Sequence, residues 1–91
     1  MEVMLDCALL REKSSAHAYL QQAFSFPEWY GKNLDALYDC LTELPPCRVE
    51  LKNPAALYEE GSYGARILQT LQDAARENPG LELFAGNEVE E

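Results

Sequence analysis

Three short segments of the 91-residue sequence alternate apolar and polar residues, and stretches with helical spacing separate them. The alternating segments are 2–7 (EVMLDC), 47–52 (CRVELK) and 81–86 (LELFAG). A period of two residues is typical of a strand with one buried face, whereas strands buried on both faces are continuously apolar. The three strands are therefore expected to form a sheet covered on one side, with Met4 and Phe84 as apolar exceptions.

Helical patterns fill both connections between these strands. The first, 14–24, begins with a serine that can cap it, Ser14 or Ser15. The second follows Asn33, a good N-cap, and stops before Pro45. The second connection holds two helical patterns. A short one, 53–61, has Asn53 as its cap and Pro54 at its first position. A long one, 62–77, ends at the sequence NPG.

Strands that are joined by helical crossovers are usually parallel. The sequence therefore predicts an α/β fold of two layers, in which helices pack on one face of a three-stranded parallel sheet. The length of 91 residues suits a single domain, 1–91. The polar end GNEVEE is expected to fray over about its last five residues.

The net charge of −9 disfavours binding to nucleic acid or membrane and favours a basic partner. No apolar run approaches the ~20 residues of a membrane span, and the N-terminus lacks the pattern of a signal peptide, so a cytoplasmic protein is expected. Three cysteines without regular spacing predict reduced core residues rather than a metal site; they are Cys7, Cys40 and Cys47. No cofactor is expected.

The candidate site is the segment FPEWYGKNLDALYDCL, 26–41. Helical spacing turns three leucines toward the core: Leu34, Leu37 and Leu41. The opposite face carries Asp35, Tyr38, Asp39 and Thr42. The preceding loop adds Trp29 as an exposed aromatic, Tyr30 as a core residue, and Gly31 for a turn that other residues make at greater cost. Such a mixed surface suits a cationic, concave site like that of a nuclease.

The stretch FPEWYGKNLDALYDCLT also resembles the barstar family of intracellular ribonuclease inhibitors. The hallmark of that family is a Pro-Glu-aromatic-Tyr-Gly-x-Asn-Leu-Asp-Ala-Leu-aromatic-Asp pattern, which this stretch matches. The resemblance implies a three-stranded parallel sheet with helices on one side. It also implies tight inhibition of a secreted, barnase-type, guanyl-preferring ribonuclease, which protects the producing cell.

The resemblance implies a role for each matching residue. Asp39 takes the place of a substrate phosphate, Asp35 pairs with an arginine, and Trp29 packs on the catalytic histidine of the nuclease. Asp73 in the last long helix adds a charge contact. The expected partner-binding residues are Trp29, Gly31, Asn33, Asp35, Tyr38, Asp39, Thr42 and Asp73.

Several residues depart from the family pattern. Trp29 stands where tyrosine is usual and Tyr38 where tryptophan is usual, and Asp73 replaces a glutamate. Lys32 puts a positive charge into the binding loop, and ELPPC follows Thr42 in place of a glycine and an aromatic. These changes suggest a different nuclease of the same class, or an altered range of partners.

Two other functions remain open. An enzyme could use Asp35 and Asp39 as an acid and base, yet the sequence has no phosphate loop, metal-ligand cluster or nucleophile elbow. The only histidine, His17, is expected to have a structural role at the surface or half-buried, and Cys40 has no obvious base near it. The remaining alternative is a binding module of the same fold that binds another basic protein. The free protein is expected to be a monomer.

Overall fold

The computed structural model describes residues 1–85, so the predicted fraying of the C-terminal end lies outside the described residues. Two one-turn 3₁₀ helices, η1 and η2, accompany three strands and three α-helices. In chain order the elements are β1 (Glu2–Asp6), η1 (Cys7–Leu10), α1 (Lys13–Phe24), α2 (Leu34–Thr42), β2 (Cys47–Lys52), η2 (Pro54–Leu57), α3 (Tyr63–Glu77) and β3 (Leu81–Ala85).

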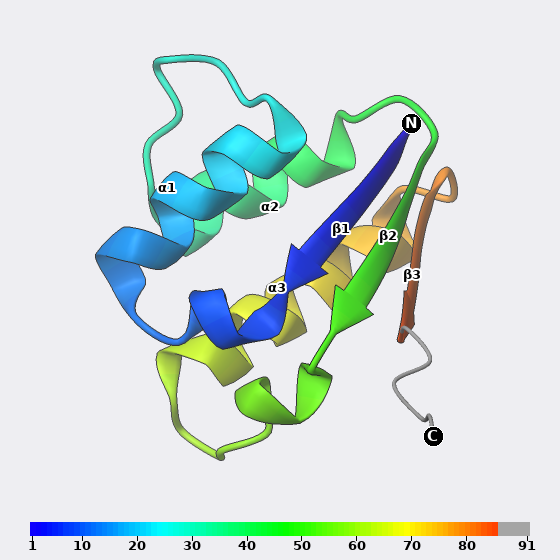
Figure 1. The fold of residues 1–91 in the computed structure, drawn as a ribbon. Coiled ribbons are helices and arrows are strands. Elements are labelled where there is room, and N and C mark those ends of the chain that lie inside the picture. The colour runs from blue at the N-terminus through cyan, green and yellow to red at the C-terminus, as the bar shows by residue number, and fades with distance from the viewer. Residues whose placement is uncertain (86–91) are drawn as a thin grey trace.

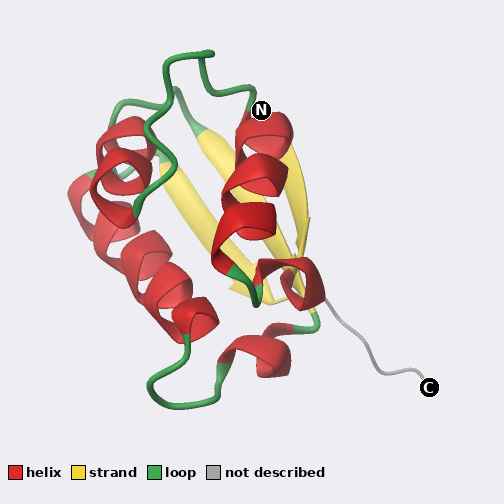
Figure 2. Cartoon of the chain, turned by 90° about the vertical axis from the view of Figure 1, so that its left-hand side faces the viewer, coloured by secondary structure: helices red, strands yellow, loops and turns green. Residues whose placement is uncertain are grey.

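The three strands form one parallel sheet in the order β1-β2-β3. Val49 in the central strand pairs with Val3 on one side and Leu83 on the other. The helices lie together on one face of this sheet, as the two perpendicular views show (Figures 1 and 2). The predicted fold class, a two-layer α/β domain with helices on one face, is confirmed.

The burial of alternate strand residues follows the sequence pattern. The covered face of the sheet buries Val3, Leu5, Cys47, Val49, Leu51 and Leu81. On the open face Met4 is 55% exposed and Phe84 is 39% exposed, which confirms both expected exceptions. The guanidinium of Arg48 lies 4.9 Å from the centre of the Phe84 ring, so a charged side chain partly covers this aromatic.

The first strand is one residue shorter than predicted. Cys7 does not continue β1 but begins η1, because the Asp6 carboxylate accepts a hydrogen bond from the Ala8 N–H at 3.1 Å. Such a side-chain bond to the backbone offers an alternative to the strand ladder. Cys7 is nevertheless buried, as is Cys47, whereas Cys40 on α2 is only half-buried.

The predicted cap of α1 is wrong, whereas Asn53 and Pro54 have their predicted positions at the start of η2 without a side-chain cap bond. Helix α1 begins at Lys13 with Glu12 in the cap position, and no side chain caps it; the Ser15 hydroxyl instead donates to the Glu12 carbonyl. Asn53 precedes η2 in a left-handed conformation and makes no side-chain cap bond. Its amide donates to the Asp6 carboxylate at 3.3 Å. The short helix itself is a single turn, Pro54–Leu57.

Helix α3 is held against the C-terminal end of α2 by the side chain of Asn78. The Asn78 amide donates to the carbonyls of Leu41 at 3.0 Å and Leu44 at 3.1 Å. Its carbonyl oxygen accepts from the Gly80 N–H at 3.0 Å, just ahead of β3. The Leu41 carbonyl also accepts from the Leu44 N–H at 3.3 Å, whereas Asn78 is the donor that the structure gives to the Leu44 carbonyl, just beyond the end of α2.

We predict that Asn78→Ala lowers the free energy of unfolding by about 1–3 kcal/mol, because it removes three side-chain hydrogen bonds and takes the donor from the partly buried Leu44 carbonyl. Denaturant unfolding followed by circular dichroism measures the change. Gln72→Ala is the control, since Gln72 is exposed on the same helix and its loss is expected to cost less than about 0.5 kcal/mol. Equal stabilities of the two variants would contradict the role of Asn78.

Candidate functional site

Helix α2 separates an apolar face from an acidic one. Leu37 and Leu41 are completely buried and Leu34 is partly buried, whereas Asp35 and Asp39 on the other side are exposed. The helix begins where Asn33 caps it, because the Asn33 side-chain oxygen accepts from the Ala36 N–H at 2.7 Å. The capping role that the sequence predicted for Asn33 is confirmed.

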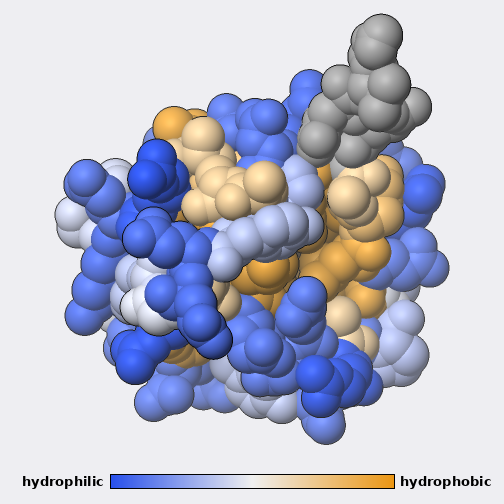
Figure 3. All heavy atoms as spheres, turned by 90° about the horizontal axis from the view of Figure 1, so that it is seen from below, coloured by the Kyte–Doolittle hydropathy of each residue, from blue (hydrophilic) through white to orange (hydrophobic). Residues whose placement is uncertain are grey.

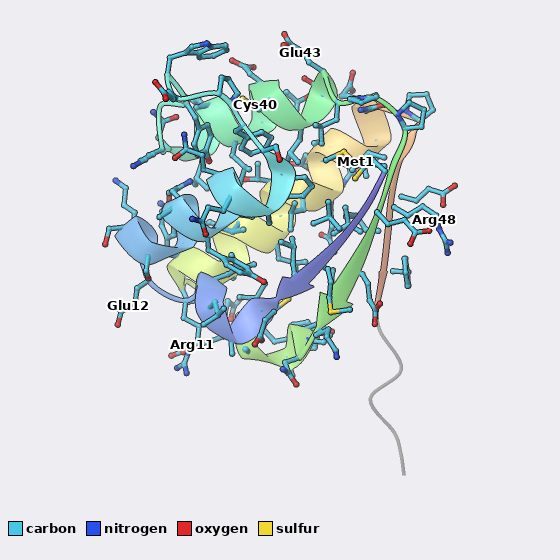
Figure 4. The ribbon with its side chains drawn as sticks, turned by 45° about the horizontal axis from the view of Figure 1, so that its top comes forward. Met1, Arg11, Glu12, Cys40, Glu43 and Arg48 are labelled. Atoms are coloured by element: carbon cyan, nitrogen blue, oxygen red, sulfur yellow. The ribbon has the colours of Figure 1, made fainter. Side chains whose placement is uncertain are left out.

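The acidic side chains of α2 are unpaired. Within residues 1–85, neither Asp35 nor Asp39 takes part in an ion pair. Segment 26–43 holds four acidic residues and a single base, Lys32. Glu43, at the C-terminal end of α2, follows Asp39 by four residues and points away from the molecule (Figure 4). The helix and its C-cap residue therefore expose three carboxylates at a spacing of four residues, one more than sequence reasoning had assigned to this segment.

The loop before α2 exposes one aromatic side chain and buries two. Trp29 is 77% exposed, whereas Phe26 is 8% exposed and Tyr30 is 4% exposed. The ring of Phe26 stacks on Phe24 at the end of α1 and contacts Tyr30 at a centroid distance of 4.9 Å. The prediction that Tyr30 belongs to the core and Trp29 to the surface is confirmed.

The predicted reason for Gly31 is wrong. The left-handed residue of this loop is Lys32, with φ = 57°, and Gly31 does not have a positive φ. Glycine instead fits here because a Cβ atom would lie 3.3 Å from both the Ala36 Cβ and the Asn33 side-chain nitrogen, a tight approach. Lys32 thus supplies the turn and also presents its charge from an exposed position.

His17 is fully buried, so the expectation of a surface or half-buried position was wrong, although its role is structural. Its Nδ1 lies 2.7 Å from the Tyr30 hydroxyl and its Nε2 lies 2.6 Å from the Tyr63 hydroxyl. A neutral imidazole donates a hydrogen bond from one ring nitrogen and accepts one at the other. One tyrosine hydroxyl can therefore accept from the imidazole while the other donates to it. Sequence reasoning missed this contact with the loop, because residues 17, 30 and 63 meet only in the folded chain.

Burial shifts the pKa values of this group toward the uncharged forms. Burial, and then the charge of nearby Lys13, lower the pKa of His17 below its ordinary value of 6.5. Burial raises the pKa of both Tyr30 and Tyr63, so their hydroxyls remain protonated at neutral pH. His17, Tyr30 and Tyr63 therefore form an uncharged, hydrogen-bonded group that connects the core to the loop.

Cys40 does not have the character of a nucleophile. Burial, followed by the charges of Glu43 and Asp39, raises the pKa of its thiol. Reactive cysteines have a lowered pKa, because the thiolate is the nucleophilic form. Cys40 lies on α2 between the acidic and the apolar faces (Figure 4) and is half-buried.

Seven of the eight predicted site residues come from segment 29–42, and the eighth, Asp73, comes from the neighbouring helix α3. Asp73 is partly exposed, and its carboxylate already has partners on its own helix. The Arg76 guanidinium lies 3.3 Å from it, and the Gln69 amide donates to it at 3.0 Å. Thr42 donates to the Asp39 carbonyl at 2.9 Å, and Tyr38 is partly buried. The partner-binding roles of these residues stay predictions.

A hollowed surface, distinct from α2 and its loop, lies at the other end of the molecule. There η1, η2 and the start of α1 enclose about 630 Å³. Viewed from this end, apolar side chains gather within a hydrophilic surround (Figure 3). The lining residues include Arg11 as well as Glu12 and Glu59, so charges of both signs meet there. A basic partner is therefore better matched by α2, whose exposed charges have one sign.

Other kinds of site find no support in the described residues. Within 1–85, no three histidine, cysteine or acidic side chains group as ligands for a metal ion. In the same part of the chain, no helix is long and apolar enough to cross a membrane.

The fold and this surface define a small α/β protein that presents an acidic and aromatic surface from a helix and its preceding loop. Comparison with known proteins gives the family. Residues 1–86 match the family model described as "Barstar (barnase inhibitor)". The chain is also similar to "Putative ribonuclease inhibitor YrdF" of Bacillus subtilis (strain 168), with 39% identity over 64 residues, which cover 67% of this chain and 70% of that protein. The chain belongs to the barstar family.

We predict that the protein loses stability in mild acid because of His17. The folded pKa of His17 is lowered, so the unfolded chain takes up a proton first as the pH falls. The free energy of unfolding is expected to be constant well above pH 6.5, to begin to fall as the pH approaches 6.5, and to decrease further below it until the folded imidazole is protonated too. Denaturant unfolding at several pH values between about 5 and 7.5 measures this change.

His17→Gln serves as the comparison, because it removes the titrating group and is expected to flatten the curve in this range. The folded pKa is read directly by NMR, since the sequence has one histidine. An imidazole midpoint at or above 6.5 in the folded protein would contradict the prediction.

Proposed function

We propose that this member of the barstar family inhibits a secreted, barnase-type, guanyl-preferring ribonuclease by plugging its active site with α2 and loop 25–33. The observation that carries this proposal is the exposed state of Asp35 and Asp39, without an ion pair within residues 1–85, together with the exposed Trp29 of the preceding loop. Membership of a family described as barnase inhibitors supports it, as does the ribonuclease inhibitor named for the Bacillus subtilis relative.

Asp39 takes the place of a substrate phosphate in the proposed complex. A carboxylate accepts paired hydrogen bonds from guanidinium groups in the way a phosphate does. Asp39 is exposed and its carboxylate has no ion-pair partner among residues 1–85, so it is available to a partner without breaking an internal bond. Asp35, one turn earlier, is available to a second arginine in the same way.

Trp29 provides the apolar contact beside these charges. A rigid aromatic side chain buries a large area on binding and loses little conformational entropy. We propose that it packs on the catalytic histidine of the nuclease, with Gly31, Asn33, Tyr38 and Thr42 completing the contact surface. Asp73 contributes from α3, where the partner must compete with Arg76 for its carboxylate.

We further propose that the inhibitor acts in the cytoplasm as a monomer, where it protects the producing cell from the nuclease before secretion. It has no catalytic activity in this proposal, and the raised pKa of Cys40 supports that view. A second candidate is a binding module of the same fold for another basic protein. Lys32 places a positive charge in the loop before the acidic helix, a departure from the family pattern that suggests an altered range of partners.

We predict that titration of a barnase-type ribonuclease with this protein abolishes RNA cleavage at a one-to-one ratio at physiological salt. The acidic surface is expected to bind tightly, because its carboxylates meet arginines in a desolvated interface. RNA cleavage at increasing inhibitor concentration measures the stoichiometry. Full activity with the inhibitor in large excess would exclude this nuclease class and favour the binding module.

We predict that Asp39→Ala weakens binding by about 2 kcal/mol or more, which is about thirtyfold, and leaves the fold intact. Truncation leaves a positive charge of the partner buried and unpaired. The control is Glu59→Ala, which removes the same charge from the loop at the opposite end of the molecule (Figure 1). Inhibition assays give the affinities and circular dichroism monitors the fold. Equal affinities for the two variants would remove Asp39 from the site.

A further inference from the structure

The core is joined to the candidate binding loop by one buried side chain. His17 lies in the middle of α1 and contacts hydroxyls from two other parts of the chain. Tyr30 belongs to the loop between α1 and α2, and Tyr63 is the first residue of α3. The imidazole therefore connects the loop to both α1 and α3 through directional hydrogen bonds.

Local hydrogen bonds also order this loop, since the Tyr30 N–H donates to the Pro27 carbonyl at 3.0 Å and the Asn33 amide donates to the Gly31 carbonyl at 3.3 Å. The other contacts with α1 hold the beginning of the loop. The amide of Gln21 donates to the Pro27 carbonyl at 2.8 Å, and Phe26 stacks on Phe24. Beyond Pro27, the only side chain that enters the core before α2 is Tyr30. Its ring contacts Phe26, an apolar contact that tolerates sliding, whereas the bond of its hydroxyl to His17 has a fixed direction.

The position of Tyr30 sets the positions of its neighbours in the chain. Trp29, which immediately precedes it, has its own side chain largely in solvent and therefore gains little from packing. Asn33, which caps α2, follows after only two residues, Gly31 and Lys32. A change in the position of Tyr30 would therefore displace both the exposed aromatic and the start of the acidic helix.

We propose that His17 is a positioning residue for binding of the partner nuclease. It holds Tyr30 so that Trp29 and the N-terminal turn of α2 are already in their binding geometry in the free protein. The identity of the partner in this inference rests on the proposed function. The inferred geometry of the loop does not depend on it. Preorganisation raises affinity because the loop is already ordered in the free protein, so binding does not have to supply the entropy cost of ordering it.

The test compares variants that remove one hydroxyl or the imidazole. Tyr30→Phe and Tyr63→Phe each remove one bond to His17 and keep the aromatic ring, and His17→Gln removes the imidazole. Tyr19→Phe is the matched control. Tyr19 also lies on α1, and its hydroxyl accepts a hydrogen bond from the Asp6 N–H at 2.8 Å, outside the loop. The Tyr19→Phe variant therefore loses a comparable hydrogen bond and leaves the contacts of Tyr30 unchanged.

The first measurement needs no partner. Trp29 is the only tryptophan, so its fluorescence anisotropy decay reports the mobility of the loop. Tyr30→Phe and His17→Gln are expected to add a fast component of large amplitude, whereas Tyr19→Phe retains the wild-type decay. An unchanged decay in folded Tyr30→Phe would overturn the proposal, as would an equal change in the Tyr19→Phe control.

The second measurement is dissociation from the nuclease, followed by stopped-flow competition. Tyr30→Phe is expected to dissociate about fivefold faster than wild type, the factor that corresponds to one neutral hydrogen bond, and Tyr19→Phe at the wild-type rate. Equal rates for the two variants would overturn the positioning role. If the wild-type protein does not bind the nuclease at all, the proposed function fails, and the anisotropy of Trp29 still decides whether His17 positions the loop.

Discussion

The hydrogen bond between the imidazole of His17 and the hydroxyl of Tyr30 connects the core of the molecule to its candidate binding surface. A polar group is costly to bury unless it is hydrogen-bonded, and His17 is satisfied at both ring nitrogens. The loop can therefore bury the ring of Tyr30 and leave the adjacent Trp29 in solvent. Without this bond the ring of Tyr30 would contact the core through apolar packing, and the hydrogen bonds left in the second half of the loop are local ones, such as that from the Tyr30 N–H to the Pro27 carbonyl at 3.0 Å.

Helix α2 is fixed at both ends by asparagine side chains. Asn33 caps its first turn, and Asn78 from α3 binds carbonyls at its C-terminal end. Two buried leucines, Leu37 and Leu41, hold its inner face. On its outer face Asp35 and Asp39 form no ion pair within residues 1–85, so the helix keeps its position without a salt bridge from either carboxylate. A helix supported in this way can expose like charges and still have a defined position.

Local patterns predicted the sheet and the acidic helix, because alternation and helical spacing depend on residues close in sequence. The Asn33 cap, the buried Tyr30 and the exposed Trp29 were predicted for the same reason. The end of β1 was misplaced because the Asp6 side chain competes for the next backbone N–H. The position of His17 could not be predicted, since its two partners lie 13 and 46 residues away along the chain.

In the proposed complex, the arrangement of charges concentrates recognition on α2. The repulsion between Asp35 and Asp39 costs the free protein only about 0.2–0.5 kcal/mol, because both carboxylates are in water. The same carboxylates gain far more from a cation in a desolvated interface, where the effective dielectric constant is lower. Asp73 differs because Arg76 already pairs with it, so a partner arginine there replaces one interaction with another. In the proposed complex the net gain from charge therefore comes mainly from α2, and the affinity depends on how firmly that helix and its loop are held.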